Sequence, residues 1–178
     1  MATIAELLAS SLNALKQVQR GEDFTIIKSS DLSRTHIKRL VDNHFLKPII
    51  KGWYVVTDPR ATPGDSTAWY ASFWSFISRY ANERYGNEWC LSAEQSLSIY
   101  TGATIIPNQV LIRAPKGNDY MVPLIPPTSV FNLGAELPSK IDTNNPYNLN
   151  LYTLAEAIIV ATPTMYRNDA LTMRTALA

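Results

Sequence analysis

Between residues 34 and 56, the pattern of an amphipathic helix passes directly into that of a β-hairpin. Four apolar residues recur there at steps of three and four: Ile37, Leu40, Val41 and Phe45. The positions between them carry mainly basic and polar side chains, so the predicted helix has one face to bury and one largely basic face. Two β-prone runs follow, at 45–50 and 53–56, and Gly52 between them supplies the positive φ that a tight turn requires.

The preceding residues extend this pattern into a small domain. An apolar stripe predicts a helix over about residues 3–19, ended by Gly21. A β-prone run at 24–27 follows, and side-chain oxygens are expected to cap a short helix at residues 31–32. The order helix, short helix, basic helix and hairpin predicts a winged helix-turn-helix over residues 1–60.

Residues 58–64 contain two prolines and a glycine and are predicted to form a linker. A strongly aromatic helix is then expected from residue 65 to about Tyr85, ended by Gly86. The sequence Ser92-Ala93-Glu94-Gln95 fits a capping box that opens a helix running to about Tyr100.

The rest of the chain predicts a small sheet and further helices. Strands are expected at 110–113 and 120–125, joined by a turn at 115–118, with a third at 129–133 and a loop over 138–150. Thr153 and Glu156 suggest another capping box, for a helix that stops before Pro163, and residues 168–178 have a helical pattern without a terminator. The predicted fold class is therefore α+β, with a winged helix followed by a second α+β domain over 65–178. Whether the natural chain continues beyond Ala178 stays open.

Charge is distributed unevenly along the chain. Residues 1–60 carry nine Lys or Arg against six acids, whereas the remainder carries seven against nine, although the net charge of the whole is only +1. A positive lobe is typical of a part that meets phosphate. The residues predicted to contact DNA are Arg34, Thr35, His36, Lys38, Arg39, Lys47, Lys51 and Gly52. The alternatives are that these charges are simply solvated or that the domain docks a protein.

The sequence offers no pattern for catalysis. His36 and His44 stand eight residues apart without a cysteine pair or clustered carboxylates, so no metal site is expected, and His44 is predicted to close the basic helix. No glycine-rich phosphate loop or nucleophile-histidine motif is present, which predicts a protein with no cofactor and no enzyme activity of its own. Cys90 is expected to be a buried structural thiol. No apolar run approaches the length of a membrane span, and we expect a cytoplasmic protein.

Several short stretches, in their order along the chain, resemble a known family. Asp31-Leu32-Ser33 through Lys51-Gly52-Trp53-Tyr54, then residues 91–97 and 106–110, resemble the AbiEi-type abortive-infection antitoxins. The opening residues 1–8 and the segment 64–74 are similar to the winged-helix amino-terminal region of bacterial Fic-type (cell filamentation) proteins. The resemblance implies a DNA-facing role for the basic helix and for the turn Lys51-Gly52. No catalytic Fic loop is present, so it implies no catalytic residue.

Two functions follow as hypotheses. The first is a bacterial transcription regulator or antitoxin-like module that binds double-stranded DNA through residues 24–57, while residues 65–178 contact a toxin or a Fic catalytic domain. The second is a protein-interaction module that regulates a Fic catalytic domain without binding DNA. The sequence does not predict the operator, the partner or the oligomeric state.

Overall fold

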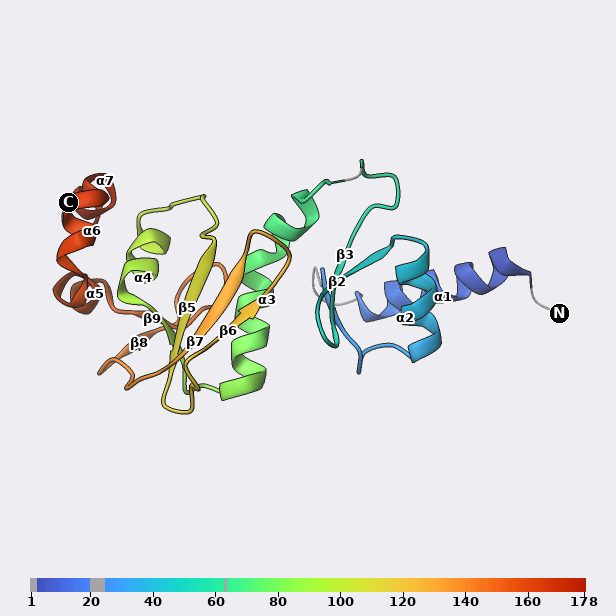
Figure 1. Ribbon diagram of the computed structural model, residues 1–178, viewed down its shortest axis with the longest axis horizontal. Helices are drawn as coiled ribbons and strands as arrows, with labels where there is room; N and C mark the ends of the chain where they lie inside the picture. Colours follow the sequence, from blue (N-terminus) through green and yellow to red (C-terminus); the bar gives the residue numbers. More distant parts are fainter. Residues whose placement is uncertain (1–2, 20–24, 63) are drawn as a thin grey trace. The chain divides into compact units, whose positions relative to one another are not determined.

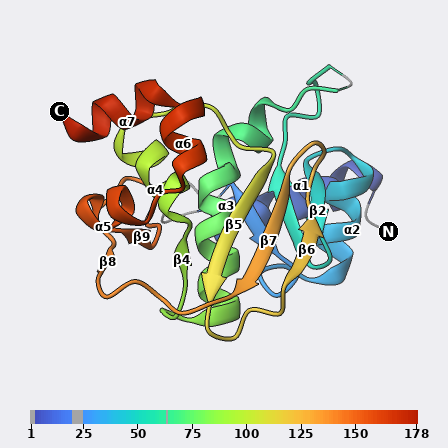
Figure 2. The same cartoon turned by 60° about the vertical axis from the view of Figure 1, so that its left-hand side comes forward.

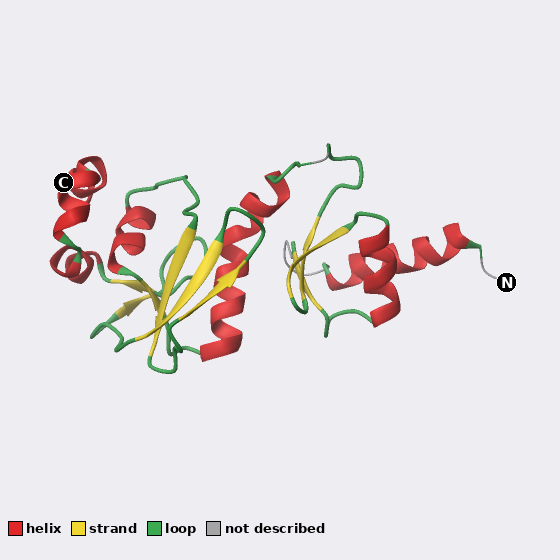
Figure 3. Cartoon of the chain, viewed as in Figure 1, coloured by secondary structure: helices red, strands yellow, loops and turns green. Residues whose placement is uncertain are grey.

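A computed structural model of the 178-residue chain describes residues 3–19, 25–62 and 64–178. The chain is an α+β protein, as Figures 1 and 3 show, and it forms two compact units, Met1–Phe73 and Trp74–Ala178. The boundary lies within a single helix, α3 (Thr67–Tyr85). Gly21, which was predicted to end the first helix, lies outside the described residues. No helix of the described part is long and apolar enough to cross a membrane.

The described residues of the first unit form two complete helices and three strands, besides the start of α3. Its elements are α1 (Ile4–Val18), β1 (Ile26–Lys28), α2 (Arg34–Asp42), β2 (Leu46–Ile50) and β3 (Trp53–Val56). A capping box fixes the start of α1, because Thr3 Oγ1 accepts from the Glu6 backbone N–H while the Glu6 carboxylate accepts from the Thr3 N–H at 2.7 Å. Both predicted long helices and the hairpin are present close to their expected bounds.

The short helix predicted at residues 31–32 is wrong. Residues 29–32 form a turn, in which the Asp31 N–H donates to the Lys28 carbonyl at 3.0 Å. The Asp31 carboxylate accepts from the Lys28 N–H at 2.8 Å, so it closes the turn at the end of β1 instead of capping a helix. The chain therefore passes from β1 to α2 without a second helix between them.

The three strands form one antiparallel sheet in the order β1-β3-β2. Lys51 and Gly52 make the hairpin turn, and Gly52 has a φ of 82°. Helices α1 and α2 cover one face of the sheet through a cluster of buried apolar side chains: Leu15, Ile27, Leu32, Ile37, Leu40 and Leu46. This core holds α2 in place with its other side exposed.

The end of α2 is closed by backbone geometry. The His44 N–H donates to the Val41 carbonyl at 3.0 Å and the Phe45 N–H to the Leu40 carbonyl at 2.9 Å, which together form a Schellman motif. His44 occupies the left-handed position of this motif, with a φ of 61°. The prediction that His44 closes the helix is confirmed, but the backbone conformation rather than the imidazole charge does it.

The second unit contains most of α3, a four-stranded sheet and a group of short helices. Its further elements are β4 (Cys90–Leu91), α4 (Ala93–Tyr100), β5 (Gln109–Ala114), β6 (Tyr120–Pro123), β7 (Ser129–Gly134), β8 (Ile141–Asp142), β9 (Leu151–Tyr152), α5 (Leu154–Val160), α6 (Pro163–Asn168) and α7 (Ala170–Leu177). The larger sheet has the order β4-β5-β7-β6, and β5 and β7 are parallel. Figure 2 shows α4 to α7 gathered beyond its β4 side.

Several local predictions in this unit are confirmed and others corrected. The predicted strands exist, but β5 and β6 are not neighbours, because β7 lies between them. Within the loop predicted over 138–150 there is a short strand, β8. Pro163 opens a helix that the sequence pattern did not predict. The predicted helix at 168–178 is α7.

The two predicted capping boxes of this unit are only half formed. Ser92 accepts from the Gln95 N–H, but the Gln95 side chain turns to the sheet, where it donates to the Gln109 carbonyl and accepts from the Leu111 N–H. Thr153 likewise caps α5, whereas the Glu156 carboxylate accepts from the Ser139 N–H. Both side chains tie a helix to a distant segment, which local sequence cannot indicate.

Candidate nucleic-acid interface

The predicted contact residues of α2 lie on its exposed side. Ser33 caps the helix by accepting from the His36 N–H, and successive residues then turn by about 100°. Arg34, Thr35 and Lys38 are exposed and Arg39 is half-buried, whereas the core face is buried. The structure therefore brings four of the predicted residues onto one arc of α2.

An acidic residue lies in the middle of this basic arc. The Asp42 carboxylate pairs with the Lys38 ammonium one turn earlier, and the two side chains are 54% and 75% exposed. Such an exposed pair contributes about 0–1 kcal/mol to stability, so Lys38 can exchange Asp42 for another anion at little cost. Without DNA, the arc is therefore less positive than its number of Lys and Arg residues suggests.

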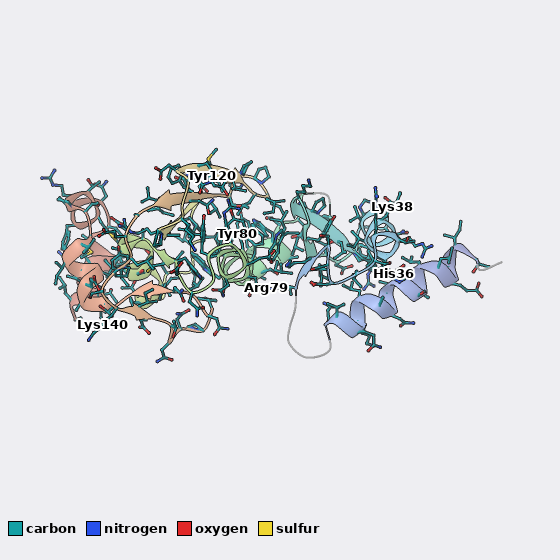
Figure 4. All side chains as sticks on the ribbon, turned by 90° about the horizontal axis from the view of Figure 1, so that it is seen from below. His36, Lys38, Arg79, Tyr80, Tyr120 and Lys140 are labelled. Atoms are coloured by element: carbon teal, nitrogen blue, oxygen red, sulfur yellow. The ribbon has the colours of Figure 1, made fainter. Side chains whose placement is uncertain are left out.

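His36 faces α1 instead of solvent. Its Nδ1 lies 2.9 Å from the Oγ of Ser11, a fully buried residue. Ser11 Oγ donates its one hydrogen to the Leu7 carbonyl at 3.0 Å, which assigns the Nδ1–H of His36 as the donor to Ser11. Figure 4 shows His36 on the α1 side of α2 and Lys38 on the other side. Only Nε2 of His36 remains for any other partner.

The hairpin turn lies beside the turn that leads into α2. The Gly52 carbonyl accepts from the Ser29 N–H at 2.8 Å, and a Cβ on residue 52 would stand 3.2 Å from Ser29 Oγ. Lys51 is exposed at this tip. Lys51 and Gly52 are therefore held next to the residues that precede Arg34.

Lys47 does not join the arc of α2. It pairs with Val55 across the hairpin, while the preceding residue, Leu46, points into the core under α1 and α2. Side chains alternate along a strand, so Lys47 points to the opposite face of the sheet. Hydrogen bonds from Thr67 lower the pKa of Asp65, and the positive charge of Lys47 adds a smaller lowering.

Lys28 is a further cation of the first unit that was not among the predicted contact residues. It follows the core residue Ile27, so its side chain points to the same face of the sheet as Lys47, away from α1 and α2. It pairs with Trp53 in the β1–β3 register, and its ammonium lies 5.4 Å from the centre of the Trp53 ring. It thus lies one residue from the Ser29 contact with the hairpin turn. Only the strand register brings Lys28 there, because in sequence it stands alone among apolar and serine residues.

The second unit holds a buried polar network around Asn132. The Tyr85 hydroxyl donates to Asn132 Oδ1 at 2.8 Å and the Tyr80 hydroxyl does so at 3.4 Å, while Arg84 Nε donates to the Tyr85 oxygen. Burial raises the pKa of both phenols, so both remain protonated donors. Figure 4 shows Tyr80 and Tyr120 in this unit. The network ties α3 to β7.

The single cysteine, Cys90, is buried. Burial raises the pKa of the Cys90 thiol to about 12, which keeps it protonated. Within the described ranges, no three His, Cys, Asp or Glu side chains are grouped so that they could hold a metal ion.

No model of a known protein family matches the chain, and none of the curated proteins compared with it matches. The resemblance to AbiEi-type antitoxins and to Fic-associated regions stays a prediction.

Proposed function

We propose that the first unit is a winged-helix module that binds double-stranded DNA through α2 and the hairpin turn at residues 51–52. The observation that carries the proposal is the exposed arc of α2, where Arg34, Lys38 and Arg39 project from the side opposite the apolar core. The element order α1-β1-α2-β2-β3 and the antiparallel sheet support it.

The dimensions of α2 suit a DNA groove. An α-helix with its side chains is about 10–12 Å in diameter, and the major groove is about 12 Å wide and admits one helix. In this arrangement the two guanidinium groups contact phosphates along the groove, and the Thr35 hydroxyl contacts a phosphate or base edge. The Lys38 ammonium exchanges Asp42 for a phosphate.

The hairpin turn supplies a second contact. Lys51 at the tip reaches the phosphate backbone beside the groove that α2 occupies. Gly52 keeps the turn tight, because a side chain there would both strain the backbone and press on Ser29. Neither His36 nor Lys47 contacts DNA in this arrangement, which revises the set of contact residues expected from the sequence.

Fluorescence anisotropy with a fluorescein-labelled mixed-sequence duplex tests the proposal. We expect the Lys38→Ala/Arg39→Ala variant to bind about tenfold or more weakly at low salt, because each lost phosphate contact removes a counterion-release term. The matched control is Lys116→Ala/Lys140→Ala, which removes the same charge from exposed positions of the second unit. Far-UV circular dichroism checks that both variants are folded.

The control separates contact from overall charge. A selective loss in the α2 variant supports direct binding by the arc. Equal weakening in both variants would show a non-specific charge effect, and undetectable binding of the unaltered chain would exclude DNA as the partner. In that last case the remaining hypotheses are that the domain docks a protein or that these charges are simply solvated.

A further inference from the structure

A cavity of about 620 Å³ lies within the second unit. Its walls come from α4, from the loop over residues 101–107 and from α7, with Trp74 of α3 closing one side. Cavities of this size hold small organic molecules. The proposed DNA contacts lie on the other unit, so the cavity is a separate feature.

The described residues that line the cavity carry negative charge and no positive charge. Among the described residues that line it, Asp169 carries the only charge, and no Lys or Arg takes part. One carboxylate oxygen of Asp169 accepts from the Thr172 N–H at 3.2 Å, where it caps α7. Asp169 is the one formal charge among the described lining residues, and it is negative, so a cationic ligand is favoured over an anionic one.

The fixed hydroxyl groups of the lining also favour a ligand that donates hydrogen bonds. Ser98 Oγ donates to the Glu94 carbonyl at 3.1 Å and Thr101 Oγ1 to the Leu97 carbonyl at 2.9 Å. Because each hydroxyl donates its one hydrogen to a backbone carbonyl of α4, its oxygen can only accept a hydrogen bond from a ligand. Thr104 and Thr175 are exposed, and their hydroxyls can rotate to serve either role.

Two apolar side chains of the lining are largely exposed. Ile105 is 85% exposed and Leu171 is 78% exposed. They come from the loop and from α7, and a ligand body between them would cover apolar surface that now meets water. The site therefore combines apolar walls, acceptor oxygens and one carboxylate.

We propose that this cavity binds an organic amine with an apolar body, its protonated nitrogen against Asp169 and its apolar part against Ile105 and Leu171. The recognition rests on charge and donor complementarity, and it holds whether or not the first unit binds DNA.

Three dansyl probes that share one fluorophore test the proposal on the full chain: dansylcadaverine, which carries a protonated amine, neutral dansylamide, and anionic dansylglycine. We expect dansylcadaverine to bind about tenfold or more tightly than the other two, because only its ammonium can form an ion-paired hydrogen bond with the Asp169 carboxylate. Dansyl emission on titration with protein gives the three affinities.

Two variants assign the binding to the cavity. Asp169→Asn removes the charge and keeps a residue that caps helices well, so it should abolish the preference for the cation while leaving α7 folded. Ala103→Trp puts a bulky side chain on an exposed lining position and should weaken binding of every probe. Glu136→Gln, an exposed charge of the same unit outside the lining, is the matched control and should change nothing.

The outcomes are distinct. A cation preference that persists in Asp169→Asn, or binding that Ala103→Trp leaves unchanged, would overturn the proposal. So would an absence of any emission change up to about 1 mM protein, which is the weak end of specific binding.

Discussion

The contact between Ser11 and His36 is the most specific link between α1 and α2, and a double-mutant cycle measures its strength. Ser11 is fully buried and its Oγ accepts from His36 Nδ1 at 2.9 Å. A neutral hydrogen bond contributes about 0.5–1.5 kcal/mol, and the half-buried ring can recover part of that from water when Ser11 becomes Ala. Ala also gains about 0.5 kcal/mol of helix propensity over Ser.

These opposing effects make the single change uninformative. Ser11→Ala alone should alter the free energy of unfolding by less than about 1 kcal/mol, since the two terms nearly cancel. The cycle of Ser11→Ala, His36→Ala and the double variant cancels the propensity term, and we expect a coupling energy of about 1 kcal/mol.

Urea unfolding of the four proteins at one fixed pH supplies the measurement. Leu40→Ala, a truncation of a fully buried core residue of α2, should destabilise by about 2–5 kcal/mol and identifies the transition that reports the first unit. A coupling energy within about 0.3 kcal/mol of zero would refute the hydrogen bond as a link between the helices.

Three further predictions concern single groups. Burial raises the pKa of the Cys90 thiol from 9.0 to about 12, so at pH 8 it should react with a thiol reagent only as fast as the chain unfolds. Because the folded state retains the proton, the free energy of unfolding should fall as pH rises from 9 towards 12. Rapid reaction of the folded protein would contradict this prediction. A hydrogen bond from the Tyr100 hydroxyl lowers the pKa of Asp142, so Tyr100→Phe should lower the free energy of unfolding at neutral pH. This loss should shrink as pH falls below 3.8, where the carboxylate becomes protonated. A loss in urea unfolding that does not depend on pH would show that the carboxylate contributes nothing. His44→Gly should raise the free energy of unfolding by up to about 1 kcal/mol, because glycine accepts the positive φ without strain; a lower midpoint in urea would argue against the left-handed conformation.

The sequence predicted those elements whose signal is local. The apolar steps at Ile37 and Leu40 and the glycine at position 52 were sufficient to place α2 and the hairpin. The short helix at 31–32 failed because Asp31 had two competing uses, as a helix cap and as the acceptor that closes a turn after β1. Only the path of the chain decides between them.

Longer-range pairings could not be predicted from the sequence. The parallel pairing of β5 with β7 passes over β6, and nothing in residues 109–134 distinguishes it from a simple meander. Gln95 likewise had the expected residue type for a capping box, but the nearby edge of β5 offered both a donor and an acceptor in better positions.

Contacts between distant segments also determine which predicted contact residues lie on the arc of α2 and which do not. Helical periodicity alone placed Arg34, Lys38 and Arg39 on one arc. It also placed His36 near that arc, because the buried hydroxyl of Ser11, 25 residues earlier, is invisible to periodicity. Lys47 follows the core residue Leu46 on β2, so strand alternation turns its side chain to the other face of the sheet.

The salt dependence of duplex binding tests the DNA-binding proposal most directly. Four cations, Arg34, Lys38, Arg39 and Lys51, contact phosphate in the proposed arrangement, and each contributes about −0.9 to the slope of log affinity against log salt concentration. We expect a slope between about −3 and −4, and Arg39→Ala should make it less steep by about 0.9 while Lys116→Ala leaves it unchanged. A slope near zero, or one that Arg39→Ala does not alter, would contradict the proposed interface.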